Sequence, residues 1–312
     1  MVSRSVARPV AASAPTPLRF GIVGCGRFGP RHARACLDST SVRLIGVHDI
    51  EGGRADAVAL SHECGAFSDL ASLRRTVDAV CVVVPPDAHA DIVESCLADG
   101  IHVLVEKPFG TDPARAVALL DLARRRRRVL MAGYVERFHP TLEAAIARAG
   151  TCERLVVRRL SRPIPGLHPV DVVHDLMSHG IEYALRLFGA APLSGIAVAR
   201  ASTDDRVETT LTFSGGRSAR ILVHRTAMAP ERTVAIGTGD GTVVADLLTG
   251  MVDDRGRSVA VPVGNPLATQ LEHFVRRIRL GDATDDDLAA RVLAVASEII
   301  DRRDHRRRRV AA

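Results

Sequence analysis

The chain has 312 residues, of which 46% are hydrophobic and 25% are charged, and its formal net charge at pH 7 is +6. This length exceeds one small core and predicts two domains, and the composition is that of a folded protein rather than a disordered one. No run of about 18 apolar residues occurs, so the sequence predicts no membrane span.

The first 17 residues are rich in alanine, serine and proline and lack the continuous apolar stretch of a secretory signal. We therefore expect a disordered lead over residues 1–17. The six cysteines form no C-x-x-C pair. This favours buried thiols in a reducing, cytoplasmic compartment and argues against a structural zinc site.

The positive charge is concentrated in two arginine runs, at residues 124–128 and 306–309. Solvated helix ends account for both runs, and no aromatic residues are interleaved with them, so the sequence predicts no nucleic-acid partner. Lys107 is the one lysine among the 42 basic residues. The pKa of a lysine can be tuned by its surroundings whereas that of an arginine cannot, so a lysine retained here points to a chemical role.

From residue 18 onward, short apolar strands alternate with helical segments. The predicted order is strand 18–23, helix 30–37, strand 42–48, helix 55–64, strand 79–84, helix 88–99, strand 102–105, helix 113–127 and strand 129–133. Buried strands that alternate with helices indicate a parallel sheet covered on both faces. The sequence therefore predicts a doubly wound domain over residues 18–136.

After about residue 150 the pattern changes to strands separated by short turns. The predicted strands are 155–160, 194–201, 207–213, 218–225, 232–237 and 242–247, and the predicted helices are 170–188, 267–281 and 285–303. Strands linked by hairpins indicate an open, mainly antiparallel sheet. The fold class is therefore α/β, with a second α/β domain over residues 137–312.

A glycine motif, G-x-G-x-x-G, follows the first predicted strand and opens the first predicted helix. Gly24 allows the tight turn, Gly26 lets backbone N–H groups approach a pyrophosphate, and Gly29 lets the helix pack on the strand. Asp49 ends the next strand, where a carboxylate accepts ribose hydroxyls and repels a 2′-phosphate; Arg54 is near enough to offset that repulsion. The sequence therefore predicts NAD as the cofactor, with NADP as the alternative.

Two further features bear on the chemistry. Lys107 lies between Glu106 and Pro108 directly after strand 102–105, at the carboxyl edge of the sheet, where ligands bind in such folds, and its bond to Pro108 can be cis. Asp175 and His179 are four residues apart on a predicted helix, so their side chains share a face and the carboxylate can orient the imidazole. An ordinary surface ion pair is the alternative interpretation of this spacing.

In this order, four features resemble the Gfo/Idh/MocA oxidoreductase family: the glycine motif, Val84-Pro85-Pro86 with His89, Glu106-Lys107-Pro108, and the Asp175–His179 pair. The resemblance spans residues 18–305. It implies a Rossmann domain followed by an α/β domain whose open sheet often forms an oligomer interface, here in a homodimer or homotetramer. It also implies that Lys107 contacts the reacting oxygen and that His179 acts as general acid or base beside Asp175.

The resemblance also supplies candidate contact residues. Those expected at the cofactor are Gly24, Gly26, Arg27, Phe28, Gly29, Asp49, Arg54, Pro85, His89, Glu106, Lys107 and Pro108. An ordinary loop and helix start is the alternative for Pro85 and His89. The residues expected at the substrate are Tyr134, Arg137, Arg162 and His168.

Segments 133–140 and 171–179 resemble the branch of the family that contains UDP-N-acetylglucosamine 3-dehydrogenases. The chain departs from this branch at Tyr134, His139 and Gly180, where the branch usually has histidine, asparagine and an acidic residue. The resemblance implies hydride transfer between nicotinamide and a sugar-like secondary alcohol or ketone, with C3 of a nucleotide-linked amino sugar as the leading site. The alternatives are a dehydrogenase or ketoreductase of a free sugar, an inositol or a secondary-metabolite intermediate, a cofactor-retaining glycosidase, and a non-catalytic NAD-sensing regulator.

Overall fold

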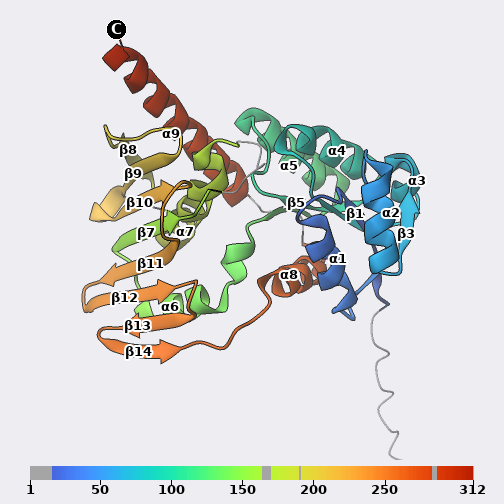
Figure 1. Ribbon diagram of the computed structural model, residues 1–312, viewed down its shortest axis with the longest axis horizontal. Helices are drawn as coiled ribbons and strands as arrows, with labels where there is room; N and C mark the ends of the chain where they lie inside the picture. The colour runs from blue at the N-terminus through green and yellow to red at the C-terminus, as the bar shows by residue number, and fades with distance from the viewer. Residues whose placement is uncertain (1–15, 164–169, 190, 283–286, 312) are drawn as a thin grey trace, which may run out of the picture.

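The computed structural model describes residues 16–163, 170–189, 191–282 and 287–311, so most of the expected lead lies outside the described residues. These residues form two sheets that lie side by side, each with its own helices (Figure 1). The first sheet has six parallel strands in the order β3-β2-β1-β4-β5-β6. Its strands are β1 (Leu18–Val23), β2 (Val42–His48), β3 (Gly65–Phe67), β4 (Ala79–Val82), β5 (His102–Glu106) and β6 (Leu130–Gly133).

Both faces of this sheet are buried, which explains its apolar strands. In β4, Ala79 and Cys81 belong to one hydrophobic cluster, and Val80 and Val82 belong to the other. The connecting helices are α1 (Gly29–Leu37), α2 (Gly52–Ser61), α3 (Leu70–Arg74), α4 (Pro86–Ala98) and α5 (Pro113–Arg126). The predicted doubly wound parallel sheet is therefore confirmed.

The second sheet has eight strands in the order β14-β13-β12-β11-β7-β10-β9-β8. All neighbours pair antiparallel except β7 and β10, which are parallel. The strands are β7 (Arg154–Leu160), β8 (Leu193–Val198), β9 (Arg206–Phe213), β10 (Ser218–His224), β11 (Glu231–Thr238), β12 (Gly241–Asp246), β13 (Met251–Asp254) and β14 (Arg257–Ala260). The prediction of a mainly antiparallel sheet is confirmed.

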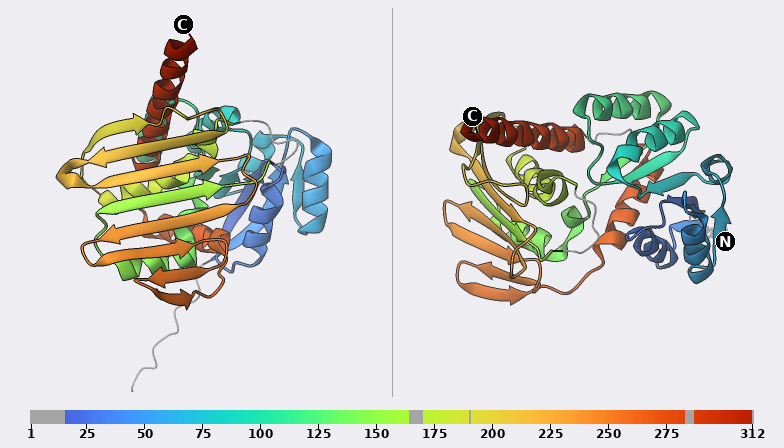
Figure 2. Two further views of the ribbon diagram at one scale, coloured as in Figure 1. Left: turned by 60° about the vertical axis from the view of Figure 1, so that its left-hand side comes forward. Right: turned by 45° about the horizontal axis from the view of Figure 1, so that its top comes forward.

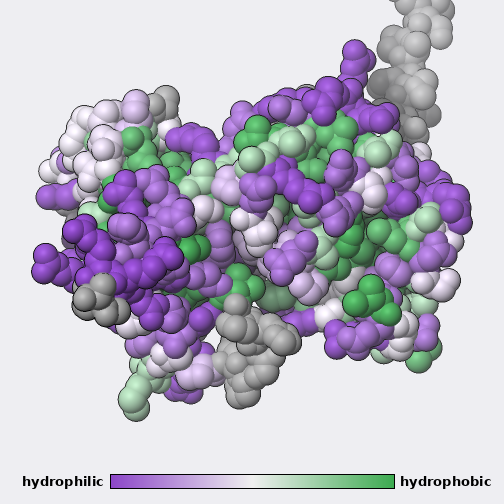
Figure 3. All heavy atoms as spheres, turned by 90° about the horizontal axis from the view of Figure 1, so that it is seen from above, coloured by the Kyte–Doolittle hydropathy of each residue, from purple (hydrophilic) through white to green (hydrophobic). Residues whose placement is uncertain are grey.

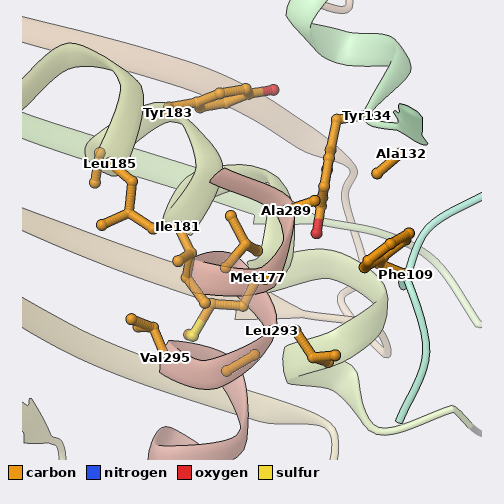
Figure 4. Packing of buried hydrophobic residues seen from close by; sticks show 14 of the residues in the cluster. Phe109, Ala132, Tyr134, Met177, Ile181, Tyr183, Leu185, Ala289, Leu293 and Val295 are labelled. Atoms are coloured by element: carbon orange, nitrogen blue, oxygen red, sulfur yellow. The ribbon is translucent and has the colours of Figure 1, made fainter. Parts of the chain in front are cut away.

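Helices cover one face of this second sheet and leave the other open, as Figure 2 shows. In β7, Leu155 and Val157 are buried, whereas Val156 between them is exposed on the open face. The covering helices are α6 (Pro140–Ala149), α7 (Ser178–Phe188) and α9 (Asp287–Ala311). Figure 4 shows residues of α7 and α9 packed together, among them Ile181 and Leu293.

A glycine lets α7 approach the sheet closely. A Cβ atom on Gly180 would lie 2.8 Å from Cγ2 of Ile221 on β10, closer than real carbon atoms pack. Gly180 is one of the positions at which the sequence departs from its branch of the family. The larger acidic side chain usual there would not fit between this helix and this sheet without movement.

Two predicted boundaries need correction. The predicted helix 170–188 is divided, because a π-helical turn, η2 (Val173–Met177), precedes α7. The predicted last helix ends at residue 303, whereas α9 continues to Ala311 and its end projects beyond the second sheet (Figure 1). Seen from above, hydrophilic side chains gather on the side of the molecule where this helix lies (Figure 3). The sequence also gave no signal for β3, α3, α6, β13 and β14, which are short or lie in mixed patterns.

The domain boundary at residue 136 is also incomplete, because α8 (Pro266–Leu280) returns to the first sheet (Figure 1). Phe274 of α8 packs its ring edge against Phe20 of β1, with the ring centroids 6.3 Å apart. The hydroxyl of Ser41 donates a hydrogen bond of 2.7 Å to Glu272. A helix that the sequence assigned to the second domain therefore belongs to the core of the first. In the described part of the chain, no helix is both long and apolar enough to cross a membrane.

Candidate active site

The glycine turn between β1 and α1 has the shape of a pyrophosphate cradle. Gly24 has a φ of +104°, and a Cβ on it would lie 2.5 Å from the carbonyl oxygen of Val83. A Cβ on Gly29 would collide with the carbonyl oxygen of Gly24. A Cβ on Gly26 would meet nothing within 4 Å. The turn is therefore tight on its inner side and open at Gly26, and the residues fit a dinucleotide whose phosphates lie at the start of α1.

Asp49 joins the end of β2 to this turn. Its carboxylate accepts hydrogen bonds from the backbone N–H groups of Cys25, at 2.6 Å, and of Glu51, at 2.8 Å. Arg54 lies further out, where its guanidinium pairs with Glu51 at 2.9 Å and both side chains are more than half exposed. The structure thus brings Asp49 to the turn and leaves Arg54 at its rim.

The start of α1 presents an aromatic side chain between two cations. Phe28 is 40% exposed, and the guanidinium carbons of Arg27 and Arg31 lie 5.7 Å and 5.1 Å from its ring centroid. Both predicted residues, Arg27 and Phe28, therefore lie at the surface beside the turn. Pro85 is the residue that precedes the first turn of α4.

His89, which was predicted to contact the cofactor, is placed between two backbone carbonyl groups. The residue is 1% exposed, and its ring nitrogens lie 2.9 Å from the carbonyl oxygens of Val84 and of Pro108. Neither nitrogen is left for a ligand. His89 instead ties the loop after β4 to the loop after β5, where the peptide bond from Lys107 to Pro108 is cis.

Glu106 is oriented from α1, by a residue that the sequence reading missed. Nε2 of His32 lies 2.9 Å from Oε1 of Glu106, and the backbone N–H of Lys107 donates to Oε2 at 3.2 Å. The other His32 nitrogen lies 3.4 Å from the sulfur of Cys81. This chain of contacts fixes the backbone from which the Lys107 side chain extends.

Lys107 reaches from the end of β5 into the second domain. Its Nζ donates to the carbonyl oxygen of Asp175 at 2.7 Å and to Oδ1 of the same residue at 2.8 Å. Burial acts to raise the pKa of Asp175, but the charges around it, led by Lys107 with its hydrogen bond, together lower that pKa. The structure therefore brings together two of the predicted catalytic residues.

His179, the third predicted catalytic residue, lies in the first turn of α7 and is 3% exposed. The ring of Tyr134 stands edge-on to it, with the centroids 6.2 Å apart. Burial is the main cause that lowers the pKa of His179 to about 3, and the charges of Arg159 and Lys107 act in the same direction. The histidine is therefore neutral at physiological pH, the form in which it can accept a proton.

Two carboxylates, those of Asp175 and Glu136, act on the charge of His179. Asp175 is hydrogen-bonded to Lys107 through Oδ1, whereas Oε2 of Glu136 lies 3.7 Å from Nδ1 of His179. The i, i+4 prediction assumed an α-helix from 175 to 179, whereas the chain makes the π-helical turn η2 before α7 begins.

Glu136 is a second residue that the sequence reading missed. It lies in the short 3₁₀ helix η1 (Val135–Phe138) and is 6% exposed. Its carboxylate accepts from the Tyr183 hydroxyl at 2.5 Å and from Arg159, and Nη1 of Arg232 lies 3.3 Å away. Burial acts to raise its pKa, but His179, Arg159 and Arg232 together hold that pKa well below its usual value. The sequence feature that could have indicated Glu136 is its place inside segment 133–140, which resembles a branch of the family.

The four residues predicted at the substrate do not share one site in the structure. Tyr134 is buried beside His179. Arg137 donates at 3.0 Å to Glu182, a fully buried carboxylate on α7, and Arg162 donates at 3.3 Å to the carbonyl oxygen of Met228. His168 lies outside the described residues. The structure thus places one of the four beside His179.

A cavity of about 750 Å³ lies elsewhere, at the amino ends of β1, β4 and β5. Arginines line it, but they are engaged: Arg19 pairs with Asp78 at 2.7 Å, Arg74 pairs with Asp99 at 3.1 Å, and Arg128 donates to the carbonyl of Gly100 beyond the end of α4. Cations beside the carboxyl ends of helices offset the negative end of the helix dipole. Lys107 and the glycine turn lie at the opposite edge of the sheet.

Comparisons with known proteins agree with this geometry. Residues 18–134 match the model of the oxidoreductase family with an NAD-binding Rossmann fold. The UDP-N-acetylglucosamine 3-dehydrogenase of Acidithiobacillus ferrooxidans is 30% identical, over 90% of this chain and 96% of that protein. A solved structure of that enzyme superposes with a TM-score of 0.83, covering 91% of this chain and 96% of the other. The inositol 2-dehydrogenase of Rhizobium meliloti is 28% identical, over 90% of this chain and 96% of that protein.

The agreement extends over both sheets, and the matched segment contains the glycine turn, Asp49 and Lys107. Retention of a whole-chain fold at this identity identifies the family, while the chemistry depends on the residues at the site. This chain belongs to the Gfo/Idh/MocA family of NAD-dependent oxidoreductases.

Proposed function

We propose that this protein oxidises a secondary hydroxyl of a nucleotide-linked sugar, at C3 of an amino sugar, with NAD as the hydride acceptor. The observation that carries the proposal is the ion pair between Lys107 and Asp175, whose Nζ and Oδ1 atoms are 2.8 Å apart. It links the domain of the glycine turn to the segment that leads into the helix of His179. The similarity to UDP-N-acetylglucosamine 3-dehydrogenase over 90% of the chain supports this substrate class.

The roles of the side chains follow from their charge states. His179 is neutral and buried, so it can take the proton of the reacting hydroxyl as general base. The ammonium of Lys107 stabilises the developing alkoxide, as an oxyanion donor does. Asp175 holds that ammonium in place through its carboxylate and its carbonyl oxygen. The bound nicotinamide supplies the hydride acceptor in oxidation and the hydride donor in the reverse reaction.

A second candidate is a dehydrogenase of a free inositol or sugar. It is supported by the 28% identity to inositol 2-dehydrogenase over 90% of the chain. Both reactions use the same base and the same oxyanion donor, so they differ in what surrounds the rest of the substrate. The nucleotide-sugar proposal ranks first because its relative is the more similar in sequence.

We further infer that the protein acts as a homodimer or homotetramer in the cytoplasm. The open face of the second sheet carries Val156, at 38% exposure, beside charged residues such as Arg158 and Arg220, and such a face is suited to pairing with a second copy. The six cysteines are all free thiols, which fits a reducing compartment. Sedimentation velocity measures the oligomeric state directly.

The test of function is absorbance at the NADH band. Purified protein is incubated with excess NAD and UDP-N-acetylglucosamine, and in parallel with free sugars and inositols. A rise with the nucleotide sugar, absent from the His179→Ala variant, supports the proposal. A rise with inositol alone favours the second candidate. Released sugar without any change in NADH would indicate a cofactor-retaining glycosidase instead, and NADH binding without turnover of any substrate would indicate a sensor.

A further inference from the structure

Two carboxylates lie within reach of the catalytic groups; Glu136 is buried, Asp175 is partly buried, and they have different neighbours. Asp175 is bonded to Lys107 through both its carboxylate and its carbonyl oxygen. Glu136 lies on the other side of His179, with Oε2 at 3.7 Å from Nδ1. We propose that Glu136, and not Asp175, is the residue that positions His179, by accepting the Nδ1 proton and leaving Nε2 free to act as the base. This inference rests on the proposed role of His179.

Glu136 is held so firmly that it can serve as a fixed acceptor. Arg159 and Arg232 both contact Oε1, and the Tyr183 hydroxyl donates to Oε2 at 2.5 Å. The Glu136 and His179 side chains are 7% and 4% exposed, so water competes little for either. A carboxylate oxygen has two lone pairs, and Tyr183 uses one of those on Oε2. The other remains for the imidazole.

The His179 ring has a nitrogen that could donate to this lone pair. Nδ1 of His179 is buried and has no hydrogen-bond partner among the residues that the structure describes. Closing the 3.7 Å gap to the roughly 2.8 Å of a charge-assisted hydrogen bond takes a small rotation of the ring. Catalytic hydrogen bonds are often long in ligand-free enzymes and tighten when substrate binds.

The electrostatic need for such a carboxylate is clear from the charges around the ring. In oxidation, the substrate O–H bond breaks and its proton passes to Nε2, while the hydride on the same carbon passes to NAD and leaves a ketone. The imidazole then carries a positive charge close to two other cations, Arg159 and Lys107. Asp175 and Glu136 are the opposing anions, and Glu136 has the larger effect of the two on His179. Its charge therefore offsets the cation that forms in the reaction.

The decisive variant is Glu136→Gln, because the neighbouring residues determine the orientation of the new amide group. Arg159 and Arg232 only donate hydrogen bonds, so they select the amide oxygen and direct the NH₂ group toward Tyr183 and His179. That NH₂ donates to Nδ1 and stabilises the tautomer with its proton on Nε2, which cannot act as the base. We expect kcat to fall about 100-fold or more, with NADH affinity and sugar KM changing by less than about threefold.

The tautomer is measured directly by ¹⁵N NMR of the histidine side chains in the NAD-bound protein, with His179→Ala used to assign the signal. Wild type should carry the proton on Nδ1, and Glu136→Gln should carry it on Nε2. Glu136→Asp keeps the negative charge, so it should retain the wild-type tautomer and turn over faster than Glu136→Gln. If the amide variant fails to fold, the wild-type spectrum still decides the question, because a proton on Nε2 of His179 in the wild type would overturn the proposal.

Asp175→Asn is the matched control. It removes the charge of the other carboxylate near His179 and should reduce turnover through Lys107 while the His179 tautomer stays as in wild type. A tautomer change in Asp175→Asn but not in Glu136→Gln would overturn the proposal. So would wild-type turnover in Glu136→Gln.

The tautomer measurement needs no substrate. A wild-type protein that oxidises no sugar would count against the proposed function, and the NMR comparison would still show whether Glu136 sets the proton position on His179. An active wild type whose Glu136→Gln variant is equally active would leave the function standing and remove Glu136 from it.

Discussion

The ammonium nitrogen of Lys107 lies 2.8 Å from Oδ1 of Asp175 and 2.7 Å from the carbonyl oxygen of the same residue. Lys107 follows the fifth strand of the nucleotide-binding sheet, and Asp175 belongs to the turn that leads into the helix of His179. The pair thus spans the two domains. An ammonium has three donor hydrogens, and these contacts use two of them, so one remains for the substrate oxygen.

Replacement of Lys107 by methionine should separate catalysis from cofactor binding. The variant keeps the length of the side chain and loses the charge, so kcat should fall by about two or more orders of magnitude while NADH still binds. Steady-state kinetics and a fluorescence titration with NADH measure the two effects. Unchanged turnover would remove the lysine from the mechanism.

The glycine turn offers a matched pair of variants. Gly26→Ala adds a methyl group where nothing lies within 4 Å, so the protein should fold normally and lose NAD affinity by about tenfold or more because the methyl occupies the phosphate position. Gly29→Ala drives its methyl into the carbonyl of Gly24 and should lower the melting temperature as well. Thermal melts measure the stability of both variants, and NAD titrations measure their cofactor affinity. Equal melting temperatures and equal affinities would contradict this account of the turn.

Asp49 should determine the preference for NAD over NADP. Asp49→Asn removes the charge that repels a 2′-phosphate, so the ratio of kcat/KM for NAD to that for NADP should fall about tenfold. Arg54→Ala is the control, since Arg54 is already paired with the exposed Glu51 and should leave NAD kinetics unchanged. If Arg54→Ala changes the ratio more than Asp49→Asn does, the guanidinium and not the carboxylate selects the cofactor.

His102 should make the fold less stable in mild acid. Its Nδ1 accepts a hydrogen bond of 2.9 Å from the backbone N–H of Val129. Burial, and then the charge of Arg128, lower its pKa from 6.5 to about 4, although Asp78 opposes them. Between these two pH values the unfolded chain binds a proton that the folded chain does not, so stability falls as the pH drops through this window.

The variant that tests this is His102→Gln, which keeps an acceptor for Val129 and cannot be protonated. Between about pH 7.5 and about pH 5, its free energy of unfolding should fall by about 1–2 kcal/mol less than that of wild type. Urea denaturation at both pH values measures the difference. An equal loss in the two proteins would assign the acid sensitivity to other groups.

Much of the fold could be predicted from the sequence because its signals are local. The apolar strands, the glycine motif and the turn after β5 each carry their own pattern, and each lies where it was expected. The features that were not predicted depend on contacts with residues distant in the sequence. Strand β3 has three residues and takes its place by pairing with β2, and α8 has an amphipathic pattern that does not say which domain it covers. The parallel pairing of β7 with β10 likewise leaves no mark in either segment.

The site could be predicted in part for the same reason. The resemblance implied that Lys107 and Asp175 belong to one site, and the structure pairs them, although a direct contact between the two was not predicted. The environment of His179 could not be predicted, because a π-helical turn changes the helix before it, and because Glu136 reaches it from an element 43 residues earlier in the chain. For His89 the sequence pattern suggested a cofactor contact and could not show that both ring nitrogens lie 2.9 Å from backbone carbonyl oxygens inside the protein.

The return of α8 to the first sheet means that the nucleotide-binding core is completed by residues synthesised long after its last strand, β6. Leu271, Phe274 and Val275 fill the face of the sheet that α1 and α2 leave partly uncovered. A nascent chain that ends at residue 136 contains all six strands but not the helix that seals them. The first half of the chain must therefore stay unsealed until the second half has emerged, and premature termination before α8 would leave an exposed apolar surface for chaperones and proteases.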